Sequence, residues 1–282
     1  MSHFRVLALT NDVEEALRPY NEQDENFFTL KDSTKQEKKY YEKYKDKDET
    51  IAEYLKKDGY KVVSDESEIE ECENERRSFA LVKNEELIKC GYFCNPNTKW
   101  DWWSDSRDGF SRYDMSDFIL KKEFEDVDVL DLRVKHIDFK AMLEKERERN
   151  REDYRKYIEA LGHQPNFKSW DMLHKEYGED FGKTDKESKI YWEQPDVKVY
   201  TEKITSWGNP DEYLCTEDEY ANKATYPFYT IVANGEWYER GEMGWFAIDS
   251  NVKDAIEFNK GFEKILSEVH PETEVHVVDC HI

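Results

Sequence analysis

Histidine and aspartate residues stand near both ends of the chain: His3 at one end, and Asp279 and His281 at the other. A histidine beside an aspartate can have its tautomer fixed and its pKa moved toward neutrality, as general acid–base chemistry requires. We therefore take His3, Asp279 and His281 as a candidate catalytic cluster of a phosphodiesterase- or nuclease-type enzyme. Two other interpretations stay open: these residues close off a sheet edge, or they hold a metal, although their spacing matches no recognised ligand motif.

Two aromatic segments form a second candidate site. The six residues concerned are Trp100, Trp102, Trp103 and Arg107 in the Trp-rich segment 92–110, and Trp237 and Trp245 near the C-terminus. Tryptophan usually packs in a core, but aromatic faces also stack on a base or ring while arginine pairs with phosphate. Glycines at 235, 241 and 244 permit either a close backbone approach to a ligand or tight turns. We predict that this set binds a small nucleotide-like ligand.

The helices and strands that must position these residues have the clearest sequence signals near the two chain ends. Residues 4–9 are typical of a buried strand, and a short helix capped by Asp12 follows them. Residues 227–280 are typical of a strand, a hairpin, a further strand, a helix and a final strand. This order predicts an α+β fold with a ferredoxin-like antiparallel sheet built from residues 1–21 and 225–282. In that topology the first strand lies between the third and the fourth, which brings His3 beside the last strand, with Asp279 and His281 on one face.

The middle of the chain, residues 22–224, is predicted to be a large, charged, mainly helical insertion. Its clearest helix covers 138–161, with apolar groups at both ends, an almost wholly charged stretch between them, and Gly162 as its end. Seven acids fall within residues 64–75, which predicts an exposed helix face or a loop, with partner recognition as the alternative.

The charge of the chain limits its partners. Sixty-five acidic and 42 basic side chains give a formal net charge of −23, but aromatics make up 15% of the residues, so the chain is expected to fold. Such a charge disfavours direct binding to nucleic acid or to an anionic membrane. It permits a basic protein partner, so a third hypothesis is an acidic protein that occupies a host nucleic-acid-binding protein.

Cofactor and compartment signals are few. No P-loop, dinucleotide fingerprint, nucleophile elbow or HExxH motif is present, so we predict no cofactor. The five cysteines include no CxxC pair, and we predict reduced thiols and no metal site. There is no apolar run of membrane-spanning length and no recognisable signal peptide, which predicts a cytoplasmic protein.

Four motifs resemble a family of largely uncharacterised bacteriophage and prophage proteins. They are the MSHF start, NPNTKWDW at 95–102, GEWYERGEMGWF at 235–246 and VVDCHI at 277–282. After Trp-Asp-Trp the family shows a Gly-Gly-Arg-Trp turn, whereas this chain has Ser104-Asp-Ser-Arg-Asp108 and keeps only the arginine, as Arg107. The resemblance implies a viral accessory protein in a bacterial cytoplasm, acting on host physiology or host defence. It carries over no known activity, catalytic residue or ligand.

Overall fold

The computed structural model describes residues 2–109, 111–178, 181–205, 208–243 and 249–282. The chain divides into two compact units. Unit 1 contains residues 1–11 and 104–279, and unit 2 contains residues 12–103 and 280–282.

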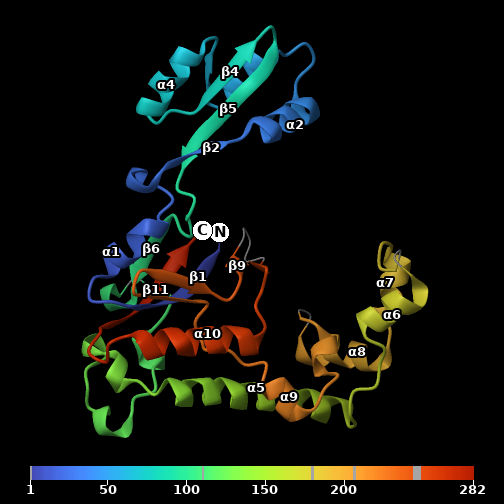
Figure 1. Cartoon of the computed structure of the whole chain (residues 1–282). Coiled ribbons are helices and arrows are strands. Elements are labelled where there is room, and N and C mark those ends of the chain that lie inside the picture. Colours follow the sequence, from blue (N-terminus) through green and yellow to red (C-terminus); the bar gives the residue numbers. More distant parts are fainter. Residues whose placement is uncertain (1, 110, 179–180, 206–207, 244–248) are drawn as a thin grey trace. The chain divides into compact units, whose positions relative to one another are not determined.

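Unit 1 contains most of a five-stranded sheet, of which β6, β11 and β1 are labelled in Figure 1. Its strands, in spatial order, are β6 (Trp102–Asp105), β11 (Val275–His281), β1 (His3–Leu9), β7 (Thr230–Ala233) and β8 (Glu236–Glu239). β1 runs parallel to β7. It runs opposite to β11, because the Thr10 N–H donates to the Glu274 carbonyl (3.1 Å) while His3 lies beside Asp279.

The α+β class and the pairing of the two chain ends in one sheet are confirmed, but the strand order differs from the ferredoxin-like one. β7, the strand that follows the long middle of the chain, lies beside β1, and β8 lies at the edge. All four residues of β7 are buried and none of β8 is, so the more apolar strand takes the central position. Asn234 and Gly235, both at positive φ, form the predicted two-residue hairpin and hold β8 next to β7.

The strand predicted at 243–248 falls largely outside the described residues. On either side of that gap, β9 (Glu242–Met243) pairs with β10 (Asp249–Ser250).

Two helices cover one face of the unit 1 sheet. Along α10 (Ala255–Glu268), buried residues Phe258, Phe262 and Ile265 recur at helical spacing, and Asp254 caps the first turn. α5 (Phe139–Leu161) begins after its cap Asp138 and ends at Gly162 in the left-handed region, as predicted. Both helices contribute to one core with the sheet residues on that face, and Figure 1 shows α10 nearer the sheet.

The far end of α5 supports a helical part of unit 1. The elements are α6 (Trp170–Tyr177), α7 (Asp185–Trp192), α8 (Pro195–Val199) and α9 (Glu217–Ala221). Four tyrosines, Tyr154, Tyr157, Tyr200 and Tyr213, form the core beneath α9 and α8. The central charged turns of α5 therefore lie between two apolar anchors, as its sequence predicts.

Unit 2 contains a four-stranded sheet of its own in the order β2-β5-β4-β3. Its elements are α1 (Val13–Leu17), β2 (Thr29–Asp32), α2 (Thr34–Tyr44), α3 (Ile51–Lys57), β3 (Lys61–Val63), α4 (Glu66–Asn74), β4 (Phe79–Lys83) and β5 (Glu86–Cys94). Two small cores lie on its two faces, one including residues of α3 and the other residues of α4. The acidic run 64–75 is α4, started by a capping box between Asp65 and Glu68.

The chain between the two ends is mainly helical, as predicted, but this sheet was not foreseen. Residues 79–83 begin with three buried positions in a row, residues 86–91 alternate only briefly, and a bulge at Leu81/Val82 interrupts the pairing, so the two-residue period is hard to read in the sequence. No helix among the described residues has both the length and the apolar character needed to cross a membrane.

Candidate functional site

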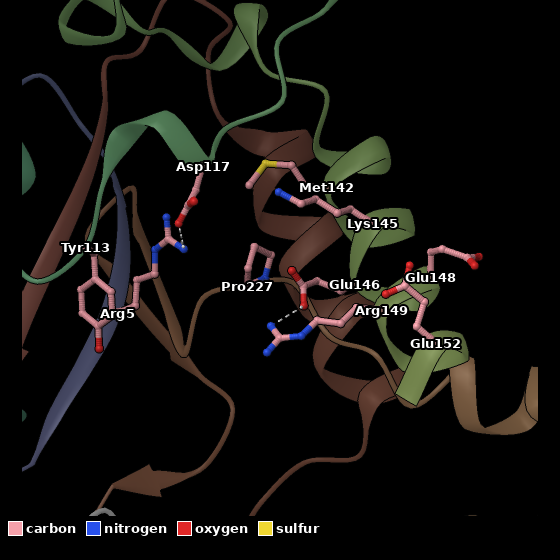
Figure 2. Close-up of a pocket in the computed structure, with 10 residues that line it drawn as sticks. All are labelled: Arg5, Tyr113, Asp117, Met142, Lys145, Glu146, Glu148, Arg149, Glu152 and Pro227. Carbon is pink, nitrogen blue, oxygen red and sulfur yellow. Dashed lines mark ion pairs between the residues drawn. The ribbon is translucent and has the colours of Figure 1, made fainter. Parts of the chain in front are cut away.

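Unit 1 contains a cavity of about 680 Å³ between β1 and the middle of α5 (Figure 2). Its lining residues are Arg5, Tyr113, Asp117, Met142, Lys145, Glu146, Glu148, Arg149, Glu152 and Pro227. The volume falls within the range of small-molecule sites. The α5 positions 142, 145, 146, 149 and 152 share one helix face, so the charged middle of that helix forms one wall.

Arg5 supplies the most constrained charge of this cavity. Nη1 lies 3.0 Å from Asp117 Oδ2, and Nη2 donates to the Asp114 carbonyl at 3.2 Å. The guanidinium lies 4.8 Å from the ring centroid of Phe228 and 5.7 Å from that of Tyr113, close enough for cation–π attraction. The side chain is only 12% exposed, and Nε is buried with no hydrogen-bond partner among the described residues.

Burial lowers the pKa of Arg5 below its ordinary value, and the neighbouring Asp117 opposes that shift. Arginine nevertheless stays protonated. The cavity therefore contains a fixed positive charge in a partly desolvated setting, where electrostatic attraction is stronger than in water.

The α5 wall combines paired and unpaired charges. Arg149 Nη1 lies 3.7 Å from Glu146, and Glu148 is bonded to Arg151 and Arg155. Within the described part of the chain, Lys145 and Glu152 have no ion pair within 4 Å. Figure 2 shows Lys145 and Arg149 extending from α5 toward Pro227 and Arg5. A cation and a carboxylate are thus free to meet a ligand in the same cavity.

Of the predicted catalytic residues, the structure brings two together. His3 Nδ1 lies 2.9 Å from Asp279 Oδ1, and their side chains are 10% and 1% exposed. His281, in unit 2, bonds through Nδ1 to Asp101 Oδ1 (2.6 Å) and stacks on Trp102. The aspartate that fixes the orientation of His281 is therefore Asp101, which the sequence interpretation did not consider.

The predicted ligand-binding residues have separate environments. Trp100 is buried in unit 2, and its Nε1 donates to the Leu17 carbonyl (3.3 Å), which is the environment of a core residue. Trp102 is 45% exposed and lies parallel to the His281 ring, with centroids 5.1 Å apart. Trp103 is half-buried in β6.

The remaining members of that set belong to unit 1 or lie outside the described residues. Arg107 is bonded to Glu274 (3.3 Å) and to the Val275 carbonyl (2.8 Å), so its guanidinium stabilises the 104–108 segment against β11. Trp237 donates to Glu239 (2.8 Å) and packs edge-on against Phe4. Trp245 lies outside the described residues.

A buried pair on β11 also escaped the sequence interpretation. His276 Nδ1 donates to Asp105 Oδ2 at 2.6 Å, and each side chain is 7% exposed. Burial by itself would raise the pKa of Asp105, but hydrogen bonds from His276 and from the Arg107 N–H hold that pKa below its ordinary value. No set of three or more His, Cys, Asp or Glu side chains in the described ranges is arranged to hold a metal.

Sequence signals for the cavity did exist. Arg5 interrupts an otherwise apolar strand, and an arginine is rarely buried without a partner. The charged turns of α5 stand between two apolar anchors, which leaves one side of that helix uncovered. The chain was also compared with known proteins: no protein-family model, curated protein or solved structure matches it.

Proposed function

We propose that the protein acts by binding a small nucleotide-like ligand in the cavity between β1 and α5. The observation that carries this proposal is Lys145, which has no ion pair with any described residue, in a cavity of about 680 Å³ that also contains the fixed guanidinium of Arg5. A phosphate would meet Lys145 and Arg5, because both are hydrogen-bond donors with positive charge. This site replaces the tryptophan set as the preferred location, because Trp100 is a buried core residue, whereas the cavity contains Lys145, which has no ion pair among the described residues.

The rest of the wall suits the other parts of a nucleotide. The carboxylate of Glu152 can accept hydrogen bonds from sugar hydroxyls, as acidic residues do in dinucleotide sites. Tyr113 and Pro227 offer apolar surface for a planar base. Given the resemblance of the motifs to bacteriophage and prophage proteins, we place this binding in a bacterial host cytoplasm, where it would act on host physiology or defence.

A thermal-shift screen followed by calorimetry tests the proposal. The ligands are nucleoside mono- and diphosphates, cyclic mono- and dinucleotides, and the matching nucleosides without phosphate. A ligand at 100 times its Kd stabilises the folded state by about 2.7 kcal/mol, which corresponds to a melting shift of about 5–10 °C for a unit of this size. If no phosphorylated member shifts the melting temperature of the folded protein, the proposal is wrong.

The matched variants are Lys145→Gln and Lys140→Gln. Both remove one lysine charge from α5, but only Lys145 lines the cavity. Lys145→Gln should weaken binding of a phosphorylated ligand about tenfold, which equals about 1.4 kcal/mol. Lys140→Gln should leave the Kd unchanged, and an equal loss in both variants would contradict the placement of the site.

A second candidate function is hydrolysis of a phosphodiester that uses His3. The contact between His3 Nδ1 and the nearly fully buried Asp279 carboxylate favours it, because that contact fixes the orientation of the ring as in acid–base enzymes. Any phosphodiesterase or nuclease turnover should fall by at least about 100-fold in His3→Gln. The control is the exposed His163→Gln, and unchanged turnover in His3→Gln would remove this candidate.

A further inference from the structure

The exposed face of α2 in unit 2 differs in charge from the rest of the chain. From residue 34 to residue 47 the sequence carries six lysines, Lys35, Lys38, Lys39, Lys43, Lys45 and Lys47, and three acids, Glu37, Glu42 and Asp46. Glu37 is 7% exposed and points inward to Tyr60, so the exposed charge of this segment is strongly positive. In a protein of net charge −23, this segment is a local exception.

The spacing of three of these lysines opposes helix stability. Lys35, Lys39 and Lys43 stand at i, i+4 and i+8, so their ammonium groups lie along one stripe of α2. Like charges at this spacing destabilise a helix. None of the three has an ion pair within 4 Å in the described part of the chain, although Asp32 is close enough to Lys35 to interact with it electrostatically. The repulsion along the stripe is therefore offset only in part.

The arginines of α5 show the contrast. Arg147, Arg149, Arg151 and Arg155 each lie within 4 Å of a glutamate on the same helix. That is the usual arrangement of a solvated charged helix, in which basic and acidic side chains alternate and pair. The α2 stripe therefore keeps like charges at a destabilising spacing, and no ion pair with a described residue offsets them. Natural proteins keep such unfavourable local arrangements mainly at functional sites, including binding surfaces.

Two exposed tyrosines stand next to the stripe. Tyr40 is 39% exposed and Tyr44 is 60% exposed, and their ring centroids are 6.1 Å apart on successive turns of α2. The ammonium of Lys43 lies 4.8 Å from the centroid of the Tyr44 ring. Exposed rings beside unpaired cations are the combination with which proteins stack bases and track phosphates of single-stranded nucleic acid.

A hollow adjoins the start of α2. It measures about 640 Å³ and is lined by Lys35 and Lys38 of the helix, by Lys89 of β5, and by Asp32, Thr34, Gln36 and Ile88. Three of the four charged residues in this lining are lysines. Lys89 lies 3.9 Å from Glu73, so the free basic character of this hollow comes from Lys35 and Lys38 of the helix.

We propose that the α2 face of unit 2, with Lys35, Lys39, Lys43, Tyr40 and Tyr44 at its centre, binds single-stranded nucleic acid. The net charge of −23 does not prevent this, because charges farther away than a Debye length of about 8–10 Å are largely screened at physiological salt. A nucleic acid is favoured over an acidic protein because nucleobases can stack on the two exposed tyrosine rings. An acidic polypeptide carries the same negative charge but has no bases to stack there. The site is separate from the cavity of unit 1 and does not depend on the function proposed for that cavity.

The test uses the full chain and fluorescence anisotropy with fluorescein-labelled 20-nucleotide oligo-dT and oligo-U at 50–200 mM salt. In Lys35→Gln/Lys39→Gln/Lys43→Gln the affinity should fall at least about tenfold, and the slope of log K against log salt should decrease by about 2. The control Lys140→Gln/Lys260→Gln/Lys264→Gln removes the same charge from exposed positions of α5 and α10 and should bind like the parent. All substituted positions are exposed, and circular dichroism verifies that the variants fold.

Two further arms decide the class of partner. Tyr40→Ala/Tyr44→Ala keeps every charge and should weaken oligonucleotide binding about tenfold by removing base stacking. Labelled poly-glutamate of similar length should bind much more weakly than oligo-dT and should not respond to the tyrosine variant. The proposal is overturned if the parent does not bind either oligonucleotide at 50 mM salt, if both triple variants lose affinity equally, or if poly-glutamate binds as tightly as the oligonucleotides.

Discussion

The buried pair of Asp105 and His276 offers a quantitative test of how unit 1 is stabilised. Asp105→Asn keeps the size of the side chain and removes its charge. Oδ1 of Asp105 accepts from the Arg107 N–H at 3.0 Å, and asparagine can preserve that contact. Oδ2 accepts from His276 at 2.6 Å, and the substitution removes this charge-assisted bond between two side chains that are each 7% exposed.

The expected loss is about 1.5–3 kcal/mol, the usual contribution of a hydrogen bond to a charged group. In a unit of this size that loss lowers the melting temperature by about 4–10 °C. The measurement is urea and thermal unfolding at pH 7, together with hydrogen exchange of the β11 amides as a local readout of unit 1. The control is Asp108→Asn, which makes the same change of charge at an exposed position of the same segment.

The pH dependence has a defined sign. The pKa of Asp105 is lower in the folded protein than its ordinary value, so the folded state binds this proton less tightly than the unfolded chain does. The contribution of Asp105 is therefore complete above the ordinary aspartate pKa of about 3.9 and is lost as the pH falls through the lower folded-state value. The parent should be more stable than Asp105→Asn at pH 5, and this difference should shrink as the pH falls below about 4. If Asp105→Asn is as stable as Asp108→Asn at pH 7, the reasoning is refuted.

Three other substitutions test separate parts of the fold. Trp100→Phe should destabilise unit 2 by about 1–3 kcal/mol in urea unfolding, because it removes a buried indole and its hydrogen bond to the Leu17 carbonyl. The control Trp102→Phe, at an exposed position, should change stability by less than about 0.5 kcal/mol. Equal effects of the two substitutions would contradict these placements. Gly235→Ala should lower stability by about 1 kcal/mol through its φ of +78° alone, since an added Cβ would meet no atom within 4 Å. An unchanged melting temperature would argue against the positive φ at this position. Burial raises the pKa of Glu37, so the charged form is disfavoured in the folded state, and its contribution to stability is present at low pH and lost as the pH rises through the folded-state pKa. Glu37→Gln should therefore raise the melting temperature by about 1–3 °C at pH 7 but not at pH 4, whereas a lower melting temperature at pH 7 would contradict the sign.

Elements with strong local signals were predictable. The helix at 139–161 has a cap at Asp138, apolar groups at both ends and a terminating glycine, and all of these act within a few residues. The hairpin at 234–235 is fixed by two residues that tolerate positive φ. Pairing of the two chain ends followed from their order of strands and helices, which is also a property of the sequence.

The sheet of unit 2 and the order of the unit 1 strands were not predictable in the same way. Short strands such as β3, with three residues, have too few positions for a period to be read. Whether β7 or β8 lies beside β1 depends on which strand buries more surface against both neighbours, and that competition is decided only when the whole sheet forms.

The sequence by itself determined the charge of the chain, its aromatic content, the α5 helix with its charged middle, and the proximity of His3 to Asp279. The tertiary structure alone decided which acid meets which base: His281 meets Asp101, His276 meets Asp105, and Arg5 meets Asp117. Hydrogen bonds reach only about 3 Å, so partners that are 100 or more residues apart depend on the exact packing of the strands. The same packing places Lys145 in one cavity with Arg5 and gives it no ion pair among the described residues, and it therefore decides where a ligand is expected.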